Sequence, residues 1–359
     1  MSQLSKFRKK FVTYPSHYQD EEQFIMQIKD SCLKNQVDLI LPSHNETEII
    51  AKHKNFIGLD LCRLVPNYEH CALFNNKSQS YDLAESIGVP VPKRFSYDSP
   101  DKLPKLLDGK GPFVIKLLTG NSSKGVYYAD NSQEASNLVK ELIIRYKLSS
   151  SRFPQVEERV VGEGWGCSVL YWKGELIADF THRRLREKIS SGGTSTMREQ
   201  SNHEGIREAA LSIFSEIGWH GLAMCEFKVC PKSNRFWFIE INPRMWGSIP
   251  LAINSGVDFP YLAVLCALQG PGVAKGFYEN SKLDLNHKSR WLLGDLAVTA
   301  KFLSHCNLVK SLKIINEKAD SLDDFYWDDP LVFFGQLLSY GINSLKTFSL
   351  NPEEKGMVN

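Results

Sequence analysis

The chain has 359 residues, of which 42% are hydrophobic and 23% charged, as in an ordinary soluble globular protein of about two or three domains. The formal net charge of +2 excludes a global field that would draw the protein to nucleic acid or to a membrane surface. The eight cysteines form no CxxC pair, and neither a signal peptide nor an uncharged apolar run of about 18 residues is present, so we expect a reduced, cytoplasmic protein without a membrane span.

The first 75 residues predict helices around one short strand. Residues 21–35 carry apolar side chains at helical spacing, and residues 37–41 (VDLIL) have the apolar run of a buried strand. A helix over residues 46–54 follows, with Ser43 or Asn45 as its cap, unless this polar segment contacts a ligand. The order helix, strand, helix favours an α/β unit with a parallel sheet.

Another helix is expected over residues 77–87, with Gly88 as its stop. Lys77 stands in its first turn, although the helix dipole favours cations at the opposite end. The position therefore indicates either an anion close to Lys77 or an exposed, solvated lysine.

A small-residue loop, TGNSSKGV, separates two strands that are expected over residues 112–116 and 126–129. Such a loop can present backbone N–H groups to phosphates, and Lys124 adds a positive charge to it. A helix over residues 132–146 and a strand that begins at residue 155 and turns at Gly162 come next.

A hairpin over residues 165–180 turns at WKGE and leads into the basic run THRRLREK. Basic runs usually form a solvated face, but Gly192 and Gly193 shortly after this one favour a mobile loop that faces an anion. A helix over residues 203–217 follows.

The sequence GLAMCEFKVCPKSNRFWFIEINPRMWG predicts two strands joined by a polar turn. Folding it about that turn sets Glu226 opposite Glu240, with Cβ atoms about 4.5–5.5 Å apart. A bound cation would remove the repulsion between these carboxylates, and Asn242 offers a third oxygen, a ligand set that suits Mg²⁺ or Mn²⁺. Two solvated acids are the alternative. In the first strand, one face is expected to hold Leu222, Met224, Glu226 and Lys228, and the other Ala223, Cys225, Phe227 and Val229. One face of the second strand is expected to hold Phe236, Phe238, Glu240 and Asn242.

Helices are expected over residues 248–255, 260–268 and 291–302. The segment DDFYWDDP at residues 323–330 is either a surface turn with an aromatic anchor or a second metal site. Residues 330–342 favour a packed core helix, with a peripheral membrane helix as the alternative.

The motifs occur in a known order. Asn76 and Lys77 precede a helix that ends in GVPVP, and PFVIK, EERVVGE, THRRLREK, CEF and EINPR follow. In this order they resemble the ATP-grasp superfamily over residues 35–270, and in particular its single-copy carboxylate–amine ligases. The resemblance implies an α/β and α+β fold with a Rossmann-like domain, a small lid and a C-terminal antiparallel-sheet domain that holds ATP against the lid.

On this chain the resemblance implies a partial Rossmann-like domain over residues 1–75, whose first strand and helix are expected to be missing. An ATP-grasp domain over residues 76–270 would follow, with its lid at about residues 105–160. Residues 271–359 would form a helical or mixed extension.

The resemblance also implies the site residues. The metal ligands would be Glu226, Glu240 and Asn242, and the catalytic residues Arg244 and Lys116. Backbone groups near Glu158 and Val161 would bind adenine, and Glu163 the ribose. The remaining nucleotide contacts would be Lys77, Lys116, Lys124 and Arg183. His182 is expected to be a binding contact rather than a general base.

The implied reaction has two steps, with Mg²⁺ and ATP as cofactors and a small-molecule carboxylate and amine as substrates. The carboxylate becomes an acyl phosphate, and the amine then displaces phosphate to give an amide. The sequence MWGSI after Arg244 disfavours carboxylation. A nucleotide-binding module without turnover is the alternative, and a homodimer is possible.

Overall fold

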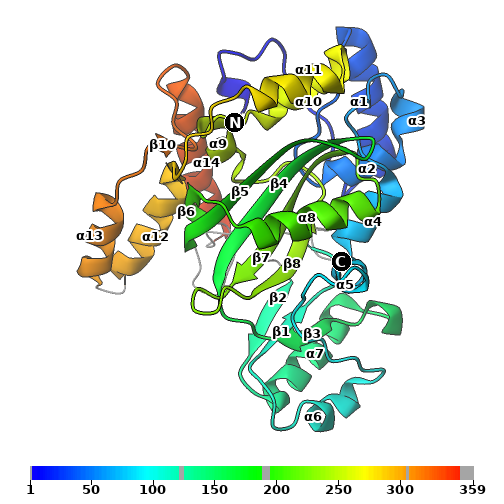
Figure 1. The fold of residues 1–359 in the computed structure, drawn as a ribbon, viewed down its shortest axis with the longest axis vertical. Helices are drawn as coiled ribbons and strands as arrows, with labels where there is room; N and C mark the ends of the chain where they lie inside the picture. The colour runs from blue at the N-terminus through cyan, green and yellow to red at the C-terminus, as the bar shows by residue number, and fades with distance from the viewer. Residues whose placement is uncertain (1, 121–124, 188–194, 305–306, 348–359) are drawn as a thin grey trace.

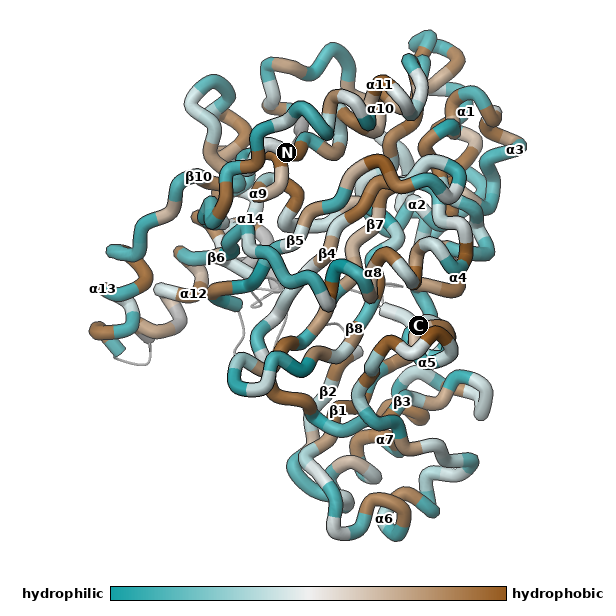
Figure 2. The backbone as a smooth tube through the Cα atoms, viewed as in Figure 1, coloured by the Kyte–Doolittle hydropathy of each residue, from teal (hydrophilic) through white to brown (hydrophobic). Residues whose placement is uncertain are grey.

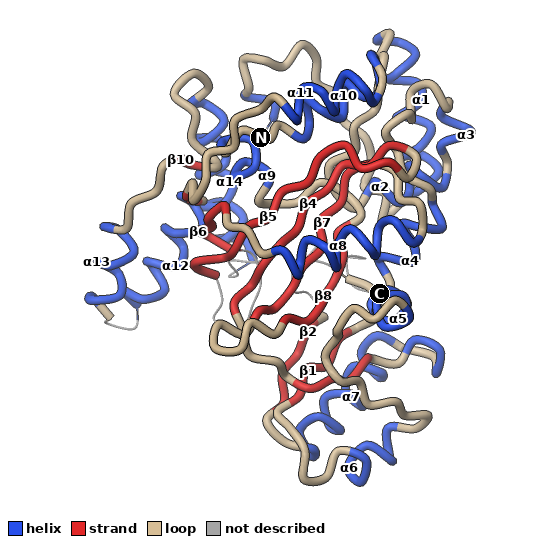
Figure 3. Tube along the Cα trace, in the orientation of Figure 1, coloured by secondary structure: helices blue, strands red, loops and turns tan. Residues whose placement is uncertain are grey.

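The computed structural model describes residues 2–120, 125–187, 195–304 and 307–347, and two β-sheets organise them. A seven-stranded sheet runs through the middle of the molecule, and a three-stranded sheet with its own helices forms a smaller unit at the bottom of the view (Figure 1). Figure 3 separates the strands of the sheets, in red, from the helices, in blue.

The N-terminal part is helical. Its helices are α1 (Glu21–Asn35), α2 (Glu46–Lys52), α3 (Lys54–Ile57), α4 (Tyr68–Asn75) and α5 (Lys77–Ser86), after a short 3₁₀ turn at Ser2–Leu4. The helix predicted over residues 21–35 is confirmed. The helix predicted over residues 46–54 ends at Lys52, and neither expected side chain caps it. The Glu46 carboxylate instead accepts hydrogen bonds from the backbone N–H groups of Ser43 and His44, both at 2.9 Å.

The strand predicted over residues 37–41 is wrong. This segment pairs with no strand, and the described residues before β1 contain no strand at all. Ile40 packs against the core on one face of the large sheet, whereas Leu39 and Leu41 pack against the core on the other. The apolar run thus packs against a sheet formed elsewhere, and the parallel α/β unit expected around it does not form in residues 2–75.

The smaller unit contains β1 (Phe113–Lys116), β2 (Val126–Ala129) and β3 (Gln155–Glu158), which form an antiparallel sheet in the order β2-β1-β3. The predicted strands are thereby confirmed, and α7 (Ser132–Tyr146) matches its prediction. Helix α6 (Leu103–Leu106) and the 3₁₀ turns Pro100–Lys102 and Ser150–Arg152 complete the unit. Its core is separate from that of the large sheet and includes Leu103, Phe113, Ile115, Ala135, Val139 and Val156.

The large sheet has the strand order β10-β9-β6-β5-β4-β7-β8. Its strands are β4 (Glu163–Trp172), β5 (Glu175–Glu187), β6 (Ser195–Gln200), β7 (Gly221–Val229), β8 (Phe236–Asn242), β9 (Lys288–Arg290) and β10 (Ser321–Leu322). The predicted WKGE turn joins β4 to β5, with Lys173 and Gly174 both at positive φ.

Helices cover both faces of this sheet. Helices α4, α5 and α8 (Glu204–Glu216) contribute to the core on one face, and α9 (Ile249–Asn254), α10 (Phe259–Gln269) and α11 (Pro271–Glu279) to the core on the other. The alternation along β7 is as predicted: Ala223 and Cys225 belong to the first core, Leu222 and Met224 to the second. Figure 2 shows hydrophobic stretches along the central strands and hydrophilic outer loops.

The β7–β8 hairpin contains a bulge that changes its predicted register. Glu226 lies opposite Glu240, as predicted, but Phe227 lies opposite Phe238, so Ile239 is the extra residue. The expectation that Phe238 shares a face with Glu240 is wrong, because Phe238 is fully buried in the first core together with Ile241. The bulge lets the strand bury its phenylalanines and still present its polar end on the opposite face.

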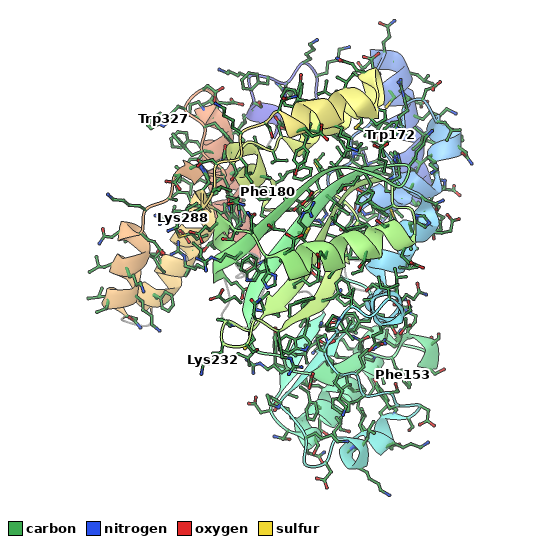
Figure 4. The ribbon with its side chains drawn as sticks, in the orientation of Figure 1. Phe153, Trp172, Phe180, Lys232, Lys288 and Trp327 are labelled. Carbon is green, nitrogen blue, oxygen red and sulfur yellow. The ribbon has the colours of Figure 1, made fainter. Side chains whose placement is uncertain are left out.

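The C-terminal part contains α12 (Leu292–Ser304), α13 (Leu308–Asn316) and α14 (Pro330–Thr347), beside β9 and β10. In DDFYWDDP, Asp324 accepts hydrogen bonds from the backbone N–H groups of Leu292 and Leu293, and the Phe325 ring packs edge-on against Phe333. Trp327 is 90% exposed and lies at the outer edge of the molecule (Figure 4). Among the described residues no three His, Cys, Asp or Glu side chains group as metal ligands. The backbone contacts of Asp324 and the packed Phe325 ring fit a turn with an aromatic anchor.

Helix α14 is amphipathic, so its interpretation as a packed core helix is wrong. Phe333 is 8% exposed, but Leu331, Phe334 and Leu338 each expose more than half of their surface. Within the described ranges, no helix combines the length and the apolar character that crossing a membrane requires.

Candidate active site

A cavity of about 480 Å³ lies between the two sheets. The small sheet contributes Val114, Lys116, Tyr128 and Glu157, and the linker to β4 contributes Arg159 to Gly162. The large sheet contributes Arg184, Glu187, Glu226, Lys228, Glu240 and Asn242, and the segment after β8 contributes Arg244 to Ser248. The antiparallel hairpin β7–β8 thereby places its polar end at the centre of the cavity.

Glu226 is held by two neighbours. The Arg184 Nη2 lies 2.6 Å from its Oε2, and the Asn242 Nδ2 donates to its Oε1 at 3.2 Å. Burial raises the pKa of the Glu226 carboxyl, and the Arg184 guanidinium opposes that rise. The acid is therefore shielded from water but compensated by a fixed cation.

Glu240, opposite Glu226, lies near Lys77. The Lys77 Nζ is 3.5 Å from the Glu240 Oε2 and donates to the Gly120 carbonyl at 2.9 Å. Lys77 is the first residue of α5, whose cap is the Asn76 side chain, and it is buried. The anion expected near this lysine is thus Glu240, and the solvated alternative is wrong.

Lys116, at the end of β1, is also buried and paired. Its Nζ lies 2.6 Å from the Glu157 Oε1 and donates to the Tyr81 hydroxyl at 2.9 Å. Burial alone would lower the pKa of Lys116, but the Glu157 carboxylate raises it above its ordinary value, so the lysine stays protonated. The sequence predicts no role for Glu157. The next residue, Glu158, is assigned to adenine binding by resemblance.

The linker residues occupy different surroundings. Val161 lines the cavity and is 79% exposed. Glu158 and Glu163 are outside the lining residues; the Glu158 N–H donates to the Lys93 carbonyl at 2.9 Å, and Glu163 begins β4. Lys124 lies outside the described residues.

Arg183 and Arg184 face opposite sides of β5. Arg183 pairs with Glu199, with its Nη2 2.6 Å from the Glu199 Oε2, and does not line the cavity. Arg184 takes the cavity side instead. The solvated-face interpretation of the basic run is wrong for Arg184 and for Arg186, which pairs with Asp295 at 2.5 Å. Strand alternation within the run was the signal for this difference. Residues 188–194, with the expected anion-facing loop, lie outside the described part.

Arg244 lines the cavity and forms no ion pair with a carboxylate of the described residues. Its Nη2 donates to the Asn242 Oδ1 and its Nη1 to the Met245 carbonyl, both at 2.8 Å. Burial lowers the pKa of Arg244, and no salt bridge to a carboxylate of the described residues accompanies it. A guanidinium buried in this way can bind an anionic ligand.

His182 lies behind the cavity wall. Its Nε2 is 3.2 Å from the Ser248 Oγ, and burial lowers the pKa of His182 to about 3, so the ring is neutral. Gly166 on the neighbouring strand makes room for it, since a Cβ there would lie 2.4 Å from the ring Cε1. Ser248 lines the cavity and His182 does not, so the expected binding contact at His182 stays a prediction.

The donor set fits a hard divalent cation. Two opposed carboxylates and the Asn242 amide lie on one face of β7–β8. Arg184 and Lys77 now supply the positive charge that the acids require, and the Asn242 Oδ1 accepts from Arg244. Three basic side chains, Lys116, Arg184 and Arg244, line the same space, so the site can also hold a polyanion. Lys77 is outside the lining residues and reaches the site through its contact with Glu240.

Comparisons with known proteins agree with this geometry. A family model described as "ATP-grasp in the biosynthetic pathway with Ter operon" matches residues 156–289. Pyruvate carboxylase from Bacillus subtilis is 24% identical over 265 residues, which is 67% of this chain but 22% of that enzyme. The chain thus spans about a fifth of the length of this relative.

Solved structures share the fold. The biotin carboxylase domain of Hydrogenobacter thermophilus 2-oxoglutarate carboxylase, a dimer in complex with MgADP and bicarbonate, has a TM-score of 0.58 and 14% identity over 75% of this chain and 61% of that one. The L-amino acid ligase from Bacillus licheniformis has a TM-score of 0.52 and 17% identity over 71% of this chain and 62% of that one.

Proposed function

We propose that this chain, which has the ATP-grasp fold, is an ATP-dependent ligase that activates a substrate carboxylate as an acyl phosphate and transfers the acyl group to an amine. The observation that carries this proposal is the convergence of Lys116 and Arg244 with the opposed acids Glu226 and Glu240 in one cavity between two sheets, with the buried Lys77 3.5 Å from Glu240. Basic groups of this kind bind phosphates, and the acids suit the accompanying cation.

Nucleotide binding would use both sheets. Lys77 and Lys116 would contact the phosphates, and the backbone near Glu158 and Val161 would bind adenine while Glu163 binds the ribose. Glu226, Glu240 and Asn242 would hold Mg²⁺, which when bound neutralises phosphate oxygens. The MgADP complex of the biotin carboxylase domain supports these cofactors.

The chemistry needs positioning and charge neutralisation rather than a protein nucleophile. A carboxylate oxygen attacks the γ-phosphorus of ATP while the bond to the ADP oxygen breaks. Arg244 would stabilise the charge on the transferred phosphoryl group. The amine nitrogen then attacks the acyl carbon, phosphate leaves, and the nitrogen loses a proton.

The group that accepts the activated acyl group is proposed to be an amine. The similar proteins include both carboxylases and an amino acid ligase, so an amine acceptor is supported chiefly by the sequence MWGSI after Arg244. A dimer, the form described for the biotin carboxylase domain, is proposed for this chain as well.

One observation favours a nucleotide-binding module without turnover. Lys77, Lys116 and Arg184 each have an acid partner already, at 3.5, 2.6 and 2.6 Å. A site that is charge-balanced in this way could bind a nucleotide as a regulatory signal and release it unchanged.

The test is a coupled ADP-release screen with Mg²⁺ over paired carboxylates and amines, with a parallel arm that contains bicarbonate and no amine. ADP release that requires both a carboxylate and an amine supports the ligase, whereas release with bicarbonate alone identifies a carboxylase. Nucleotide binding without release under every condition favours the module. Glu240→Gln should abolish release, and Glu175→Gln, at an exposed pair with Lys275, is the matched control.

A further inference from the structure

Arg184 is built into the candidate metal site as a resident cation. Its Nη2 lies 2.6 Å from the Glu226 Oε2 and its Nη1 lies 3.6 Å from the Glu187 Oε1. The side chain is 13% exposed, and the Lys228 Nζ also lies 3.9 Å from the Glu187 Oε1. The guanidinium is therefore fixed between two acids rather than free to swing into solvent.

The neighbouring strand is shaped for this side chain. A Cβ at Gly164 would lie 2.8 Å from the Arg184 Cδ and 3.2 Å from the Glu187 Oε1. Any larger residue at position 164 would push the arginine stem away from its acids. The glycine thus leaves the space that the Arg184 stem occupies.

The two candidate metal ligands consequently differ. Both oxygens of Glu226 are engaged, one by Arg184 and one by the Asn242 amide nitrogen. Glu240 has a single, longer contact, 3.5 Å to Lys77, and its side chain is 24% exposed. An incoming cation meets Glu240 more readily than Glu226.

We propose that Arg184 permanently occupies the place that a second divalent ion would take beside Glu226, so that the chain binds one divalent ion with each nucleotide. This inference rests on the proposed function. A second divalent ion at Glu226 would have to displace a buried guanidinium from its carboxylate or approach it against like-charge repulsion.

The experiment counts ions on the full-length chain. Mn²⁺ is titrated into the protein with a saturating non-hydrolysable ATP analogue, and free Mn²⁺ is measured by electron paramagnetic resonance. The wild type should bind one Mn²⁺ per bound nucleotide. Arg184→Ala should bind a second Mn²⁺, and Arg184→Lys, which keeps the charge, should bind one.

Two further variants separate position from folding. Gly164→Ala keeps the Arg184 charge but displaces the side chain, so it should raise the affinity for a second Mn²⁺ at least several-fold above the wild type. Arg207→Ala removes an arginine from its carboxylate pair with Asp179, away from the cavity, and should leave the count at one.

The outcomes distinguish the one-ion inference from the proposed ligase function. Two Mn²⁺ per nucleotide in the wild type, or a second-site affinity for Mn²⁺ no higher than wild type in either Arg184→Ala or Gly164→Ala, overturns the inference and leaves the ligase proposal standing. Failure of the wild type to bind the nucleotide analogue overturns both. If Arg184→Ala does not fold, the wild-type count and the affinity of Gly164→Ala for a second Mn²⁺ still decide.

Discussion

Replacement of Glu157 by glutamine tests whether Lys116, which is paired with Glu157, can pair with a phosphate of ATP instead. In the structure Glu157 is 2% and Lys116 5% exposed, and their charged atoms lie 2.6 Å apart. Removing one partner of a buried ion pair typically costs about 3–5 kcal/mol, because the other charge is left uncompensated. Glutamine keeps an oxygen near Lys116, so we expect a loss of about 3 kcal/mol.

The response to ATP carries the mechanistic information. A ligand at about 100 times its dissociation constant adds about 2.7 kcal/mol to the free energy of unfolding. In Glu157→Gln this increment should exceed that of the wild type, since a phosphate would then supply the anion that Lys116 lacks. Urea unfolding at pH 7, with and without MgATP, measures both quantities.

The control is Glu175→Gln, whose partner Lys275 lies at 3.1 Å in an exposed pair. Its unfolding free energy should fall by less than about 1 kcal/mol, and its ATP increment should equal that of the wild type. The exchange of partners would be refuted if Glu157→Gln were destabilised as expected but gained no more from ATP than the wild type.

Three further predictions concern the cavity wall. Burial lowers the pKa of His182 to about 3, so between about pH 6.5 and 3 only the unfolded chain takes up a proton at this ring. This residue should therefore lower the free energy of unfolding of the wild type by about 1.4 kcal/mol per pH unit on acidification. Urea unfolding of His182→Gln between pH 7.5 and 5 should lack this part of the slope. Gly166→Ala should lose about 1–3 kcal/mol in the same assay at pH 7, since its Cβ would lie 2.4 Å from the His182 ring, and wild-type stability would refute this packing. Glu240→Gln should lose the Mg²⁺-dependent part of the ATP-induced rise in Tm, which thermal unfolding with and without EDTA measures; a full Mg²⁺ effect in the variant would exclude Glu240 as a ligand.

Local periodicity predicted much of the fold because most elements bury one face. The alternation along β7 and the apolar spacing of α1 depend on each residue's own neighbours, and both predictions are confirmed. These two features are local, so the sequence contains them in full. The opposition of Glu226 and Glu240 was predicted correctly, but in the structure it depends on the bulge at Ile239, because the turn pairs Val229 with Phe236.

The errors have non-local causes. Residues 37–41 are apolar because they touch two cores, which is indistinguishable in sequence from a buried strand. The bulge at Ile239 depends on what packs against Phe238 from other elements. Glu157 gained its partner only when β3 paired with β1, which brought its carboxylate to Lys116. Contacts of this kind require the tertiary fold.

The paired charges also imply that nucleotide and metal bind in a coupled way under the proposed function. Lys77 now lies beside Glu240, which the proposal assigns to the divalent ion. For Lys77 to contact a phosphate, Glu240 must receive another cation, and for Glu240 to bind the ion, Lys77 must receive another anion. Each ligand thus supplies the charge that the other displaces, so each should raise the affinity for the other by the same factor. Arg184 stays beside Glu226 throughout this exchange, and it is therefore the fixed charge around which the other pairs rearrange.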